Sequence, residues 1–132
     1  MTRWAFNYGL ESKKYYLEQQ GAFTHSLYDY TLFGKIKELF GGRMRILITG
    51  SAAISAEILT FFKVSLGIHV HEVYGQTESC GPITCTMPLD PTAGHVGGVS
   101  PTMKIRLKDC PELNYLSTDN PPRGELQFKG GH

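Results

Sequence analysis

The chain has 132 residues, of which 41% are hydrophobic and 19% charged, so it is long enough to form one domain with an ordinary core. Basic and acidic residues nearly balance at a formal charge of +1, which excludes the strongly basic surface typical of nucleic-acid binding. The three cysteines lack the spacing of a zinc site or a disulfide framework, and no apolar run approaches the length of a transmembrane helix.

Two helices are predicted in the N-terminal part of the chain. The first covers residues 6–20 and ends at Gly21, and the second covers residues 26–40 and ends at Gly41. We expect the lysines of both helices to lie on solvated faces: Lys13, Lys14, Lys35 and Lys37. The tyrosines are expected to be packing residues: Tyr8, Tyr15, Tyr16, Tyr28 and Tyr30.

A strand, a helix and a second strand follow. Residues 45–49 form a short apolar run rich in β-branched residues, which is typical of a buried parallel strand. Ser55 can cap the next helix and Gly67 can end it. Residues 68–73 then alternate as a strand. In open sheets with this connection, ligands bind beyond the carboxyl ends of the strands, so a site is expected there.

Candidate site residues follow both strands. Gly50, Ser51 and Ala52 come after the first strand, and small residues there would let a flat ring lie against the backbone. Residues 74–78, Tyr-Gly-Gln-Thr-Glu, come after the second and offer an aromatic face, a hydroxyl and a carboxylate for Mg²⁺. Glycine and threonine also occur at such turns for conformational reasons alone, so both interpretations stay open from the residues themselves.

The remaining part is predicted to be rich in loops and strands. Prolines and glycines between residues 82 and 101 indicate a loop-rich connection, in which His95 has a structural role. Residues 103–108 and 125–129 are predicted to be antiparallel strands. A metal site on His69 and His71 has little support because no companion ligands lie at suitable spacing, and Ser51 and Ser79 lack the context of a hydrolase nucleophile.

Four segments together resemble motifs of the adenylate-forming superfamily. They are Gly-Ser-Ala-Ala at 50–53, Tyr-Gly-Gln-Thr-Glu at 74–78, the stretch at 86–97 and Arg-Gly-Glu-Leu-Gln-Phe-Lys-Gly at 123–130. The stretch at 86–97 is similar to that of long-chain acyl-CoA synthetases. The resemblance implies an α/β fold in which residues 1–132 are a part of the large N-terminal, AMP-binding domain, with N-terminal helices, a strand-helix-strand unit and a β-rich C-terminal part, and without a complete second domain.

The resemblance also implies a reaction. A fatty acid carboxylate attacks the α-phosphate of ATP to form an acyl-adenylate, and the thiol of coenzyme A then displaces AMP. It assigns catalytic roles to Thr77 on the phosphates and to Glu78 as the Mg²⁺ ligand. The nucleotide-binding residues that it implies are Gly50, Ser51, Ala52, Glu72, Val73, Tyr74, Gly75 and Thr77. The partners are a long-chain fatty acid, ATP and coenzyme A, with no nucleic acid.

The chain also departs from the family pattern. Val73 stands where glycine is usual before the tyrosine, and Ile54 stands where proline is common. The phosphate loop ending in Pro-Lys-Gly, the ribose-binding aspartate and the catalytic lysine of the small domain have no counterpart here, so we expect the chain alone to be inactive. Two alternatives remain: a nonenzymatic adenine-nucleotide-binding remnant and a truncated gene product. The intact enzyme is expected on the cytoplasmic face of endoplasmic reticulum, mitochondrial or peroxisomal membranes, with membrane contact through parts absent from this chain.

Overall fold

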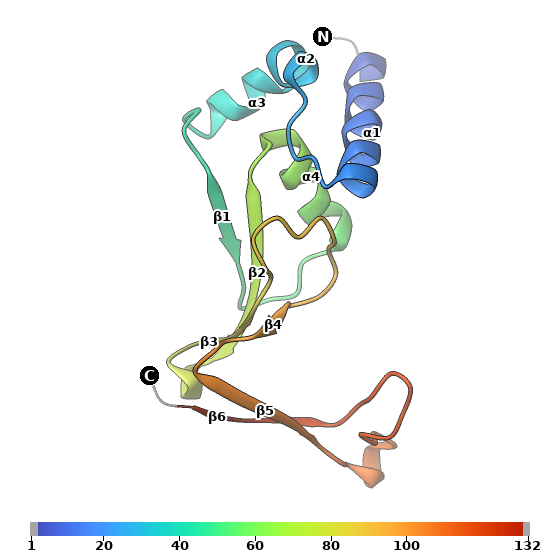
Figure 1. Ribbon diagram of the computed structural model, residues 1–132, viewed down its shortest axis with the longest axis vertical. Coiled ribbons are helices and arrows are strands. Elements are labelled where there is room, and N and C mark those ends of the chain that lie inside the picture. Colours follow the sequence, from blue (N-terminus) through green and yellow to red (C-terminus); the bar gives the residue numbers. More distant parts are fainter. Residues whose placement is uncertain (1–2, 131–132) are drawn as a thin grey trace.

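The computed structural model describes residues 3–130, and in this range the molecule is elongated, with helices at one end, a sheet in the middle and a two-stranded hairpin at the other end (Figure 1). The helices are α1 (Arg3–Gln20), α2 (Ser26–Tyr28), α3 (Gly34–Leu39) and α4 (Ala56–Leu66). The strands are β1 (Ile46–Thr49), β2 (His69–Gln76), β3 (Gly81–Cys85), β4 (Gly98–Val99), β5 (Met103–Lys108) and β6 (Glu125–Gly130).

The helical end contains a buried ion pair where the sequence predicted a solvated face. The predicted helix over residues 26–40 is interrupted by a π-helical turn at Asp29–Phe33, which separates α2 from α3. The Lys13 ammonium forms an ion pair with Asp29, lies 5.0 Å from the Phe33 ring centroid and is only 1% exposed. The prediction was therefore wrong for Lys13, because the π-helical segment covers the α1 face that carries it.

The tyrosines divide into two groups. Tyr16 and Tyr28 are half-buried and flank the His25 ring, with ring centroids 5.2 and 4.5 Å from it. The others are exposed: the Tyr8 and Tyr15 rings still lie 5.7 Å from Trp4 and 6.0 Å from Tyr16, between ring centroids, whereas the packing role was wrong for Tyr30.

The sheet confirms the predicted strand-helix-strand unit. Strand β1 pairs in parallel with β2, so that Ile46 lies opposite His69 and Thr49 opposite Glu72. Strand β2 continues beyond the predicted end at Val73 because its second half pairs with the antiparallel β3. The stretch expected to be a loop-rich connection thus contains β3 and the short β4, which pairs with it.

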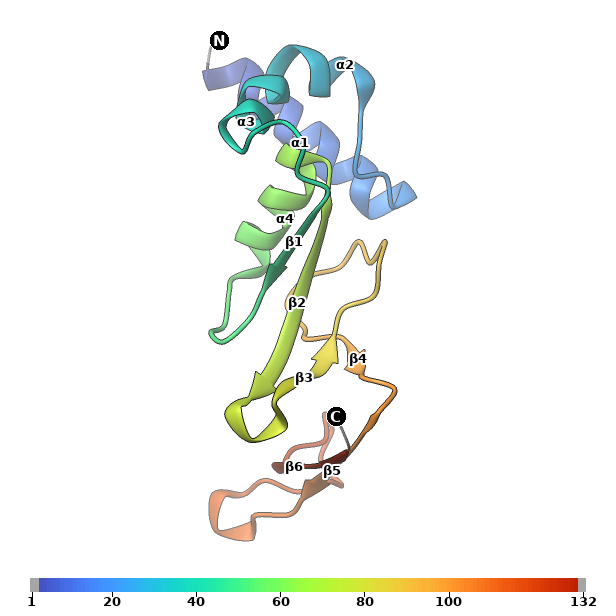
Figure 2. The ribbon, with the colours of Figure 1, turned by 90° about the vertical axis from the view of Figure 1, so that its left-hand side faces the viewer.

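Helix α4 covers one face of β1 and β2 (Figure 2). It begins where the Ser55 hydroxyl accepts a hydrogen bond from the Ile58 N–H at 3.3 Å, and it ends at Gly67, whose φ of +59° lies in the left-handed region. Both predicted ends are confirmed. Apolar burial between α4 and β2 forms one core cluster, Leu59, Leu66, Ile68 and Val70, and a second joins α4 to the N-terminal segment: Leu17, Phe23 and Val64.

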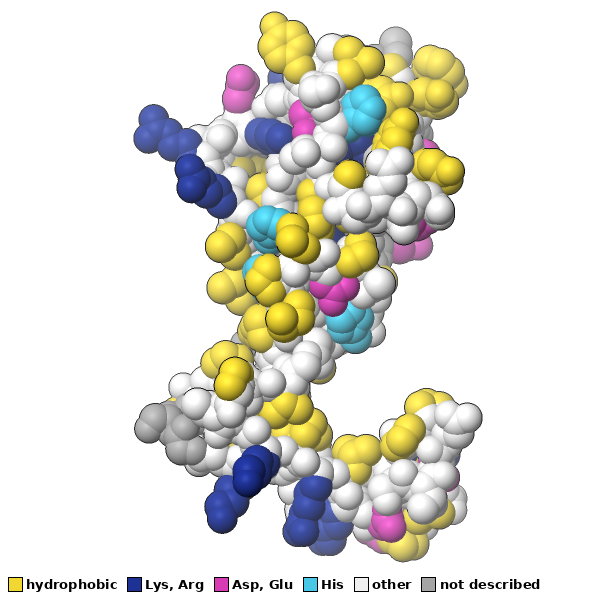
Figure 3. All heavy atoms as spheres, viewed as in Figure 1, with side chains coloured by type: hydrophobic (Ala, Val, Ile, Leu, Met, Phe, Trp, Pro, Cys, Tyr) yellow, Lys and Arg dark blue, Asp and Glu magenta, His cyan; other side chains and the backbone are white. Residues whose placement is uncertain are grey.

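The C-terminal hairpin confirms the last two predicted strands. Strands β5 and β6 are antiparallel, from Met103 opposite Gly130 to Lys108 opposite Glu125. In the space-filling view a hollow separates this hairpin from the rest of the molecule (Figure 3). Apolar residues are also exposed on β1, at 57% for Ile46 and 67% for Ile48. No helix within residues 3–130 is long and apolar enough to cross a membrane.

Candidate functional site

The two loops singled out by the sequence meet at one edge of the sheet. Because β1 and β2 are parallel and in register, the loop after β1 emerges beside the second half of β2, which contains the first residues of the motif at 74–78. Ser51 and Tyr74 line the same cavity of about 330 Å³. Its full lining is Ser51, Ala52, Ala53, Glu72, Val73, Tyr74, Gly75 and Val96.

A second, neighbouring cavity of about 510 Å³ extends the site toward the turn after β2. It is lined by Gly50, Ser51, Val73, Gly75, Gln76, Thr77, Gly81 and Pro82. Gly50 and Gly75 cannot be replaced by another residue unless the surrounding backbone moves. A Cβ on Gly50 would lie 2.9 Å from the Val73 carbonyl oxygen, and a Cβ on Gly75 would lie 2.6 Å from the Gly81 carbonyl oxygen. Ser51 has a φ of +68°, a conformation that is uncommon for a residue with a side chain and often found at binding sites.

Ser79 holds the turn that carries Thr77 and Glu78. It is fully buried, its hydroxyl accepts a hydrogen bond from the Gln76 N–H at 3.0 Å, and the carbonyl oxygens of Gln76 and Gly81 lie within 2.7 Å of it. The turn Thr77–Ser79 is a short 3₁₀ helix, on which Thr77 lines the larger cavity. Glu78 is exposed and does not line either cavity.

Glu72 lines the smaller cavity and has a buried carboxylate oxygen. Both backbone polar groups of Glu72 form hydrogen bonds with Thr86. The Glu72 N–H donates to the Thr86 hydroxyl, and the Thr86 N–H donates to the Glu72 carbonyl oxygen, each at 3.0 Å. The residue is 8% exposed, and its Oε2 has no hydrogen-bond partner among residues 3–130. An unpartnered buried carboxylate oxygen is costly, so Glu72 is a candidate acceptor for a ligand that binds in this cavity.

Sequence reasoning missed several lining residues. Val96 reaches the smaller cavity from a loop distant in sequence, and Gln76 and Pro82 line the larger one. The Gln76 side-chain amide also donates a hydrogen bond to the Tyr74 hydroxyl at 2.7 Å. Gln76 lies inside the motif at 74–78 and Val96 inside the stretch at 86–97, which were the available signals, but neither pattern indicated that these side chains line the cavities.

Glu78 is the carboxylate that the family resemblance assigns to Mg²⁺. Within the described part of the chain, no three His, Cys, Asp or Glu side chains gather into a metal-binding group. His71 Nδ1 lies 3.0 Å from the Thr86 carbonyl oxygen, so the position of this ring follows from a contact with the polypeptide. A single exposed carboxylate fits Mg²⁺ that is bound mainly by phosphate oxygens and water, which is the usual mode at nucleotide sites.

Comparison with known proteins decides the family. Residues 9–132 match the family model described as AMP-binding enzyme. The chain belongs to the AMP-binding enzyme family. Among curated family members, the human long-chain-fatty-acid–CoA ligase 1 is 38% identical over 130 residues, which cover 98% of this chain and 18% of that protein. Mouse long-chain-fatty-acid–CoA ligase 5 is 44% identical over 107 residues, covering 81% of this chain and 15% of that protein.

Solved structures of AMP-binding enzymes share the fold. The adenylation domain of a carboxylic acid reductase from Segniliparus rugosus, determined with AMP and a co-purified carboxylic acid, aligns with a TM-score of 0.59 and 32% identity. The alignment covers 92% of this chain and 18% of that one. The corresponding domain from Mycobacterium chelonae gives the same TM-score of 0.59 at 27% identity, covering 96% of this chain and 19% of that one. The chain thus spans less than a fifth of the proteins that it matches.

Proposed function

We propose that this chain is the nucleotide-binding part of a long-chain fatty-acid–CoA ligase, which activates a fatty acid with ATP and transfers the acyl group to coenzyme A. The observation that carries the proposal is the cavity shared by the loop after β1 and the second half of β2. The names of the family members in human and mouse support the substrate class. Two Arabidopsis relatives are named as peroxisomal, which supports an enzyme associated with an organelle.

In this proposal the smaller cavity takes the adenine ring. Ser51 and Ala52 line one side of it, with Gly50 beside them in the larger cavity, and the half-buried Tyr74 ring offers an aromatic surface. The Glu72 Oε2 would accept a hydrogen bond from the exocyclic amino group, which is the kind of donor that this buried oxygen lacks. Val73 and Gly75, on either side of Tyr74 in β2, also line this cavity.

The larger cavity takes the phosphates. Thr77 lines it and its hydroxyl can donate to a phosphate oxygen. Glu78, on the same turn, would hold Mg²⁺ together with those phosphate oxygens. When bound, the ion neutralises the negative charge on the phosphates. Buried Ser79 keeps the turn in place, so that Thr77 and Glu78 keep a constant position relative to the cavity.

A binding experiment on the chain tests the adenine pocket. We expect AMP to bind to it in isothermal titration calorimetry, and Tyr74→Ala to weaken binding about ten-fold or more, since stacking of a base on an aromatic ring contributes about 1–3 kcal/mol. The matched control is Tyr15→Ala, which removes a tyrosine that is 61% exposed on α1. Equal affinities for the wild type and Tyr74→Ala would show that adenine does not bind here.

The complete enzyme tests the catalytic part. We expect Glu78→Gln to suppress pyrophosphate release with ATP and palmitate. The control is Glu57→Gln, which changes an exposed glutamate on α4 away from the site and should leave pyrophosphate release unchanged. For the isolated chain, we expect AMP binding without sustained thioester formation. Unchanged pyrophosphate release in Glu78→Gln would remove this residue from the mechanism.

A further inference from the structure

The loop of residues 86–97, which connects β3 to β4, is fixed at both ends. At its start, Thr86 exchanges hydrogen bonds with the backbone of Glu72 on β2. At its end, Gly97 has a φ of +76°, and a Cβ there would lie 2.1 Å from the Cys85 carbonyl oxygen. Only glycine allows such a close approach of the two chain segments. The loop therefore begins and ends against the strands that carry the site.

The middle of the 86–97 loop is held by a buried lysine. Lys63 on α4 is 2% exposed, and its ammonium donates to the carbonyl oxygens of Asp90, at 2.9 Å, and Thr92. Burial lowers the pKa of Lys63, although the negative charges of Asp90 and Glu72 oppose the shift. Since an ammonium without hydrogen-bond acceptors is unstable in the interior, Lys63 and the loop depend on each other.

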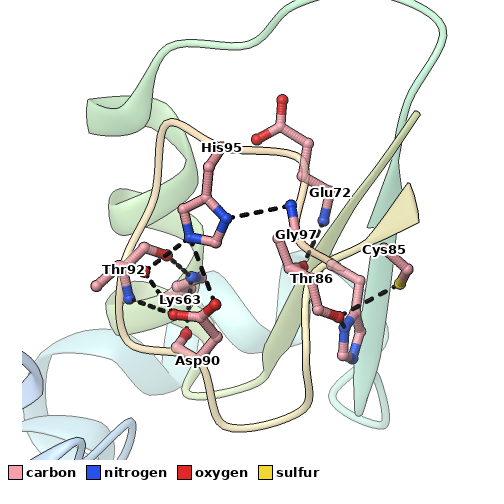
Figure 4. A network of polar contacts seen from close by, with 9 residues as sticks. Lys63, Glu72, Cys85, Thr86, Asp90, Thr92, His95 and Gly97 are labelled. Atoms are coloured by element: carbon pink, nitrogen blue, oxygen red, sulfur yellow. Dashed lines mark hydrogen bonds and ion pairs between the residues drawn. The ribbon is translucent and has the colours of Figure 1, made fainter. Parts of the chain in front are cut away.

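A second set of contacts orders the end of the 86–97 loop (Figure 4). The Asp90 carboxylate accepts hydrogen bonds from the Thr92 N–H, at 2.9 Å, and from its hydroxyl, at 2.6 Å. His95 Nδ1 accepts a hydrogen bond from the Gly97 N–H at 3.1 Å, and its Nε2 lies 2.8 Å from the Thr92 hydroxyl oxygen. Because Nδ1 accepts and the Thr92 hydroxyl donates to Asp90, His95 must carry its hydrogen on Nε2.

Partial burial raises the pKa of Asp90, but the hydrogen bonds from Thr92 and the positive charge of Lys63 outweigh this effect and lower it. The carboxylate thus stays ionised and continues to accept both hydrogen bonds from Thr92. The loop has two polar supports, Lys63 at its middle and the Asp90–Thr92–His95 cluster near its end. Both act on the segment that leads directly to Val96.

Val96 lies between His95 and Gly97 and lines the cavity that also contains Glu72 and Tyr74. We propose that Lys63, Asp90 and His95 are positioning residues, which hold the 86–97 loop so that Val96 forms a wall of the nucleotide cavity. They do not line the cavity themselves. The inference rests on the proposed function, because it assigns the wall to a nucleotide.

The test uses the whole chain and two readouts. Amide hydrogen exchange measured by NMR reports the loop, and calorimetry with AMP reports the cavity. We expect His95→Ala to speed exchange at Gly97 and to weaken AMP binding about five-fold, the factor that corresponds to one neutral hydrogen bond. His95→Asn, whose Oδ1 can replace Nδ1 as the acceptor, should restore both values. A merely structural contribution to stability would not give this rescue.

Lys63→Met is the second variant, because it keeps an unbranched side chain only one atom shorter and removes the donors. We expect it to weaken AMP binding about ten-fold or more, since hydrogen bonds from a charged group are stronger. Lys104→Met, on an exposed position of β5, is the matched control and should bind AMP like the wild type. If Lys63→Met does not fold, the exposed His95 variants still decide the question.

Three results would overturn the proposal: unchanged exchange at Gly97 in His95→Ala, faster exchange with unchanged AMP affinity, or equal effects of His95→Ala and His95→Asn. Failure of the wild type to bind AMP would instead contradict the proposed function. In that case the exchange rates alone decide: acceleration in His95→Ala with rescue in His95→Asn supports positioning of the loop, and no acceleration overturns it.

Discussion

Replacing Asp29 by asparagine should destabilise the chain strongly, because it leaves the Lys13 ammonium buried without its counter-ion. Lys13 is 1% exposed and the Asp29 side chain is 14% exposed, so water cannot replace the lost partner. Asp29 also accepts a hydrogen bond from the His25 N–H at 3.0 Å. Lys37 lies 3.7 Å from the same carboxylate but is partly solvated, so it contributes little.

The expected magnitude follows from this geometry. Removing one partner of a buried ion pair costs about 3–5 kcal/mol of the free energy of unfolding. Because Asp29 is slightly exposed, we expect a loss of about 3 kcal/mol. This is a large share of the roughly 5–15 kcal/mol by which domains are stable. With a urea dependence of about 2 kcal/mol per molar, the unfolding midpoint should fall by about 1.5 M.

The assay is urea unfolding followed by circular dichroism at pH 7 and at pH 10. Burial lowers the pKa of Lys13 below its ordinary value of 10.5, while the hydrogen bond and charge of Asp29 raise it. Where the folded pKa is below the unfolded one, the unfolded chain binds more protons and stability rises with pH. Without Asp29 the pKa falls further, so the difference between variant and wild type should shrink as pH rises toward 10.5.

Glu11→Gln is the control, because it breaks an exposed pair with Lys14 whose atoms are 2.8 Å apart, and it should change stability by less than about 0.5 kcal/mol. If Asp29→Asn is no more destabilising than Glu11→Gln, or if its effect is the same at both pH values, the Lys13–Asp29 pair does not behave as a buried pair and the reasoning is refuted.

The other predictions concern the turn, the sheet edge and one carboxyl group. Ser79→Ala should lower stability by about 1–3 kcal/mol in thermal unfolding, because it removes the buried hydroxyl that accepts a hydrogen bond from the Gln76 N–H; an unchanged midpoint would contradict this. Ile48→Lys should raise the concentration at which the chain aggregates in light scattering, with stability within about 0.5 kcal/mol of the wild type, since the residue is 67% exposed. Hydrogen bonds from the Ser117 backbone and side chain lower the pKa of Asp109 below its ordinary value of 3.8, so we expect an NMR titration midpoint below 3.8. The stabilising effect of this carboxylate should then disappear only as pH falls through the lowered pKa. A midpoint at or above 3.8 would exclude the contact in solution.

Much of the fold could be predicted because its signals are local. The cap at Ser55 and the end at Gly67 were readable, since each depends on one residue and its immediate neighbours. Strand β3 was not, because its proline suggested a loop. Pro82 sits beside the register shift between Tyr74 and Gly75, where the pairing is irregular.

The candidate site was predicted in part. The glycines at positions 50 and 75 and the residues from Tyr74 to Thr77 belong to short motifs that follow strands, and the structure places them along adjoining cavities. Val96 and Ser79 could not be assigned in this way. Val96 reaches the cavity through contacts between segments that are distant in the chain, and the role of Ser79 depends on the burial of its hydroxyl. Neither feature produces a periodic pattern in the sequence.

The sequence by itself determined the family, the strand-helix-strand unit and the two motifs after its strands, because hydrophobic periodicity, caps and motifs are properties of contiguous residues. Only the tertiary structure decided the environment of each charge. Lys13 was predicted on a solvated face and no pattern indicated the environment of Lys63, yet both are buried, because segments distant in the chain supply the acceptors that make an interior ammonium tolerable.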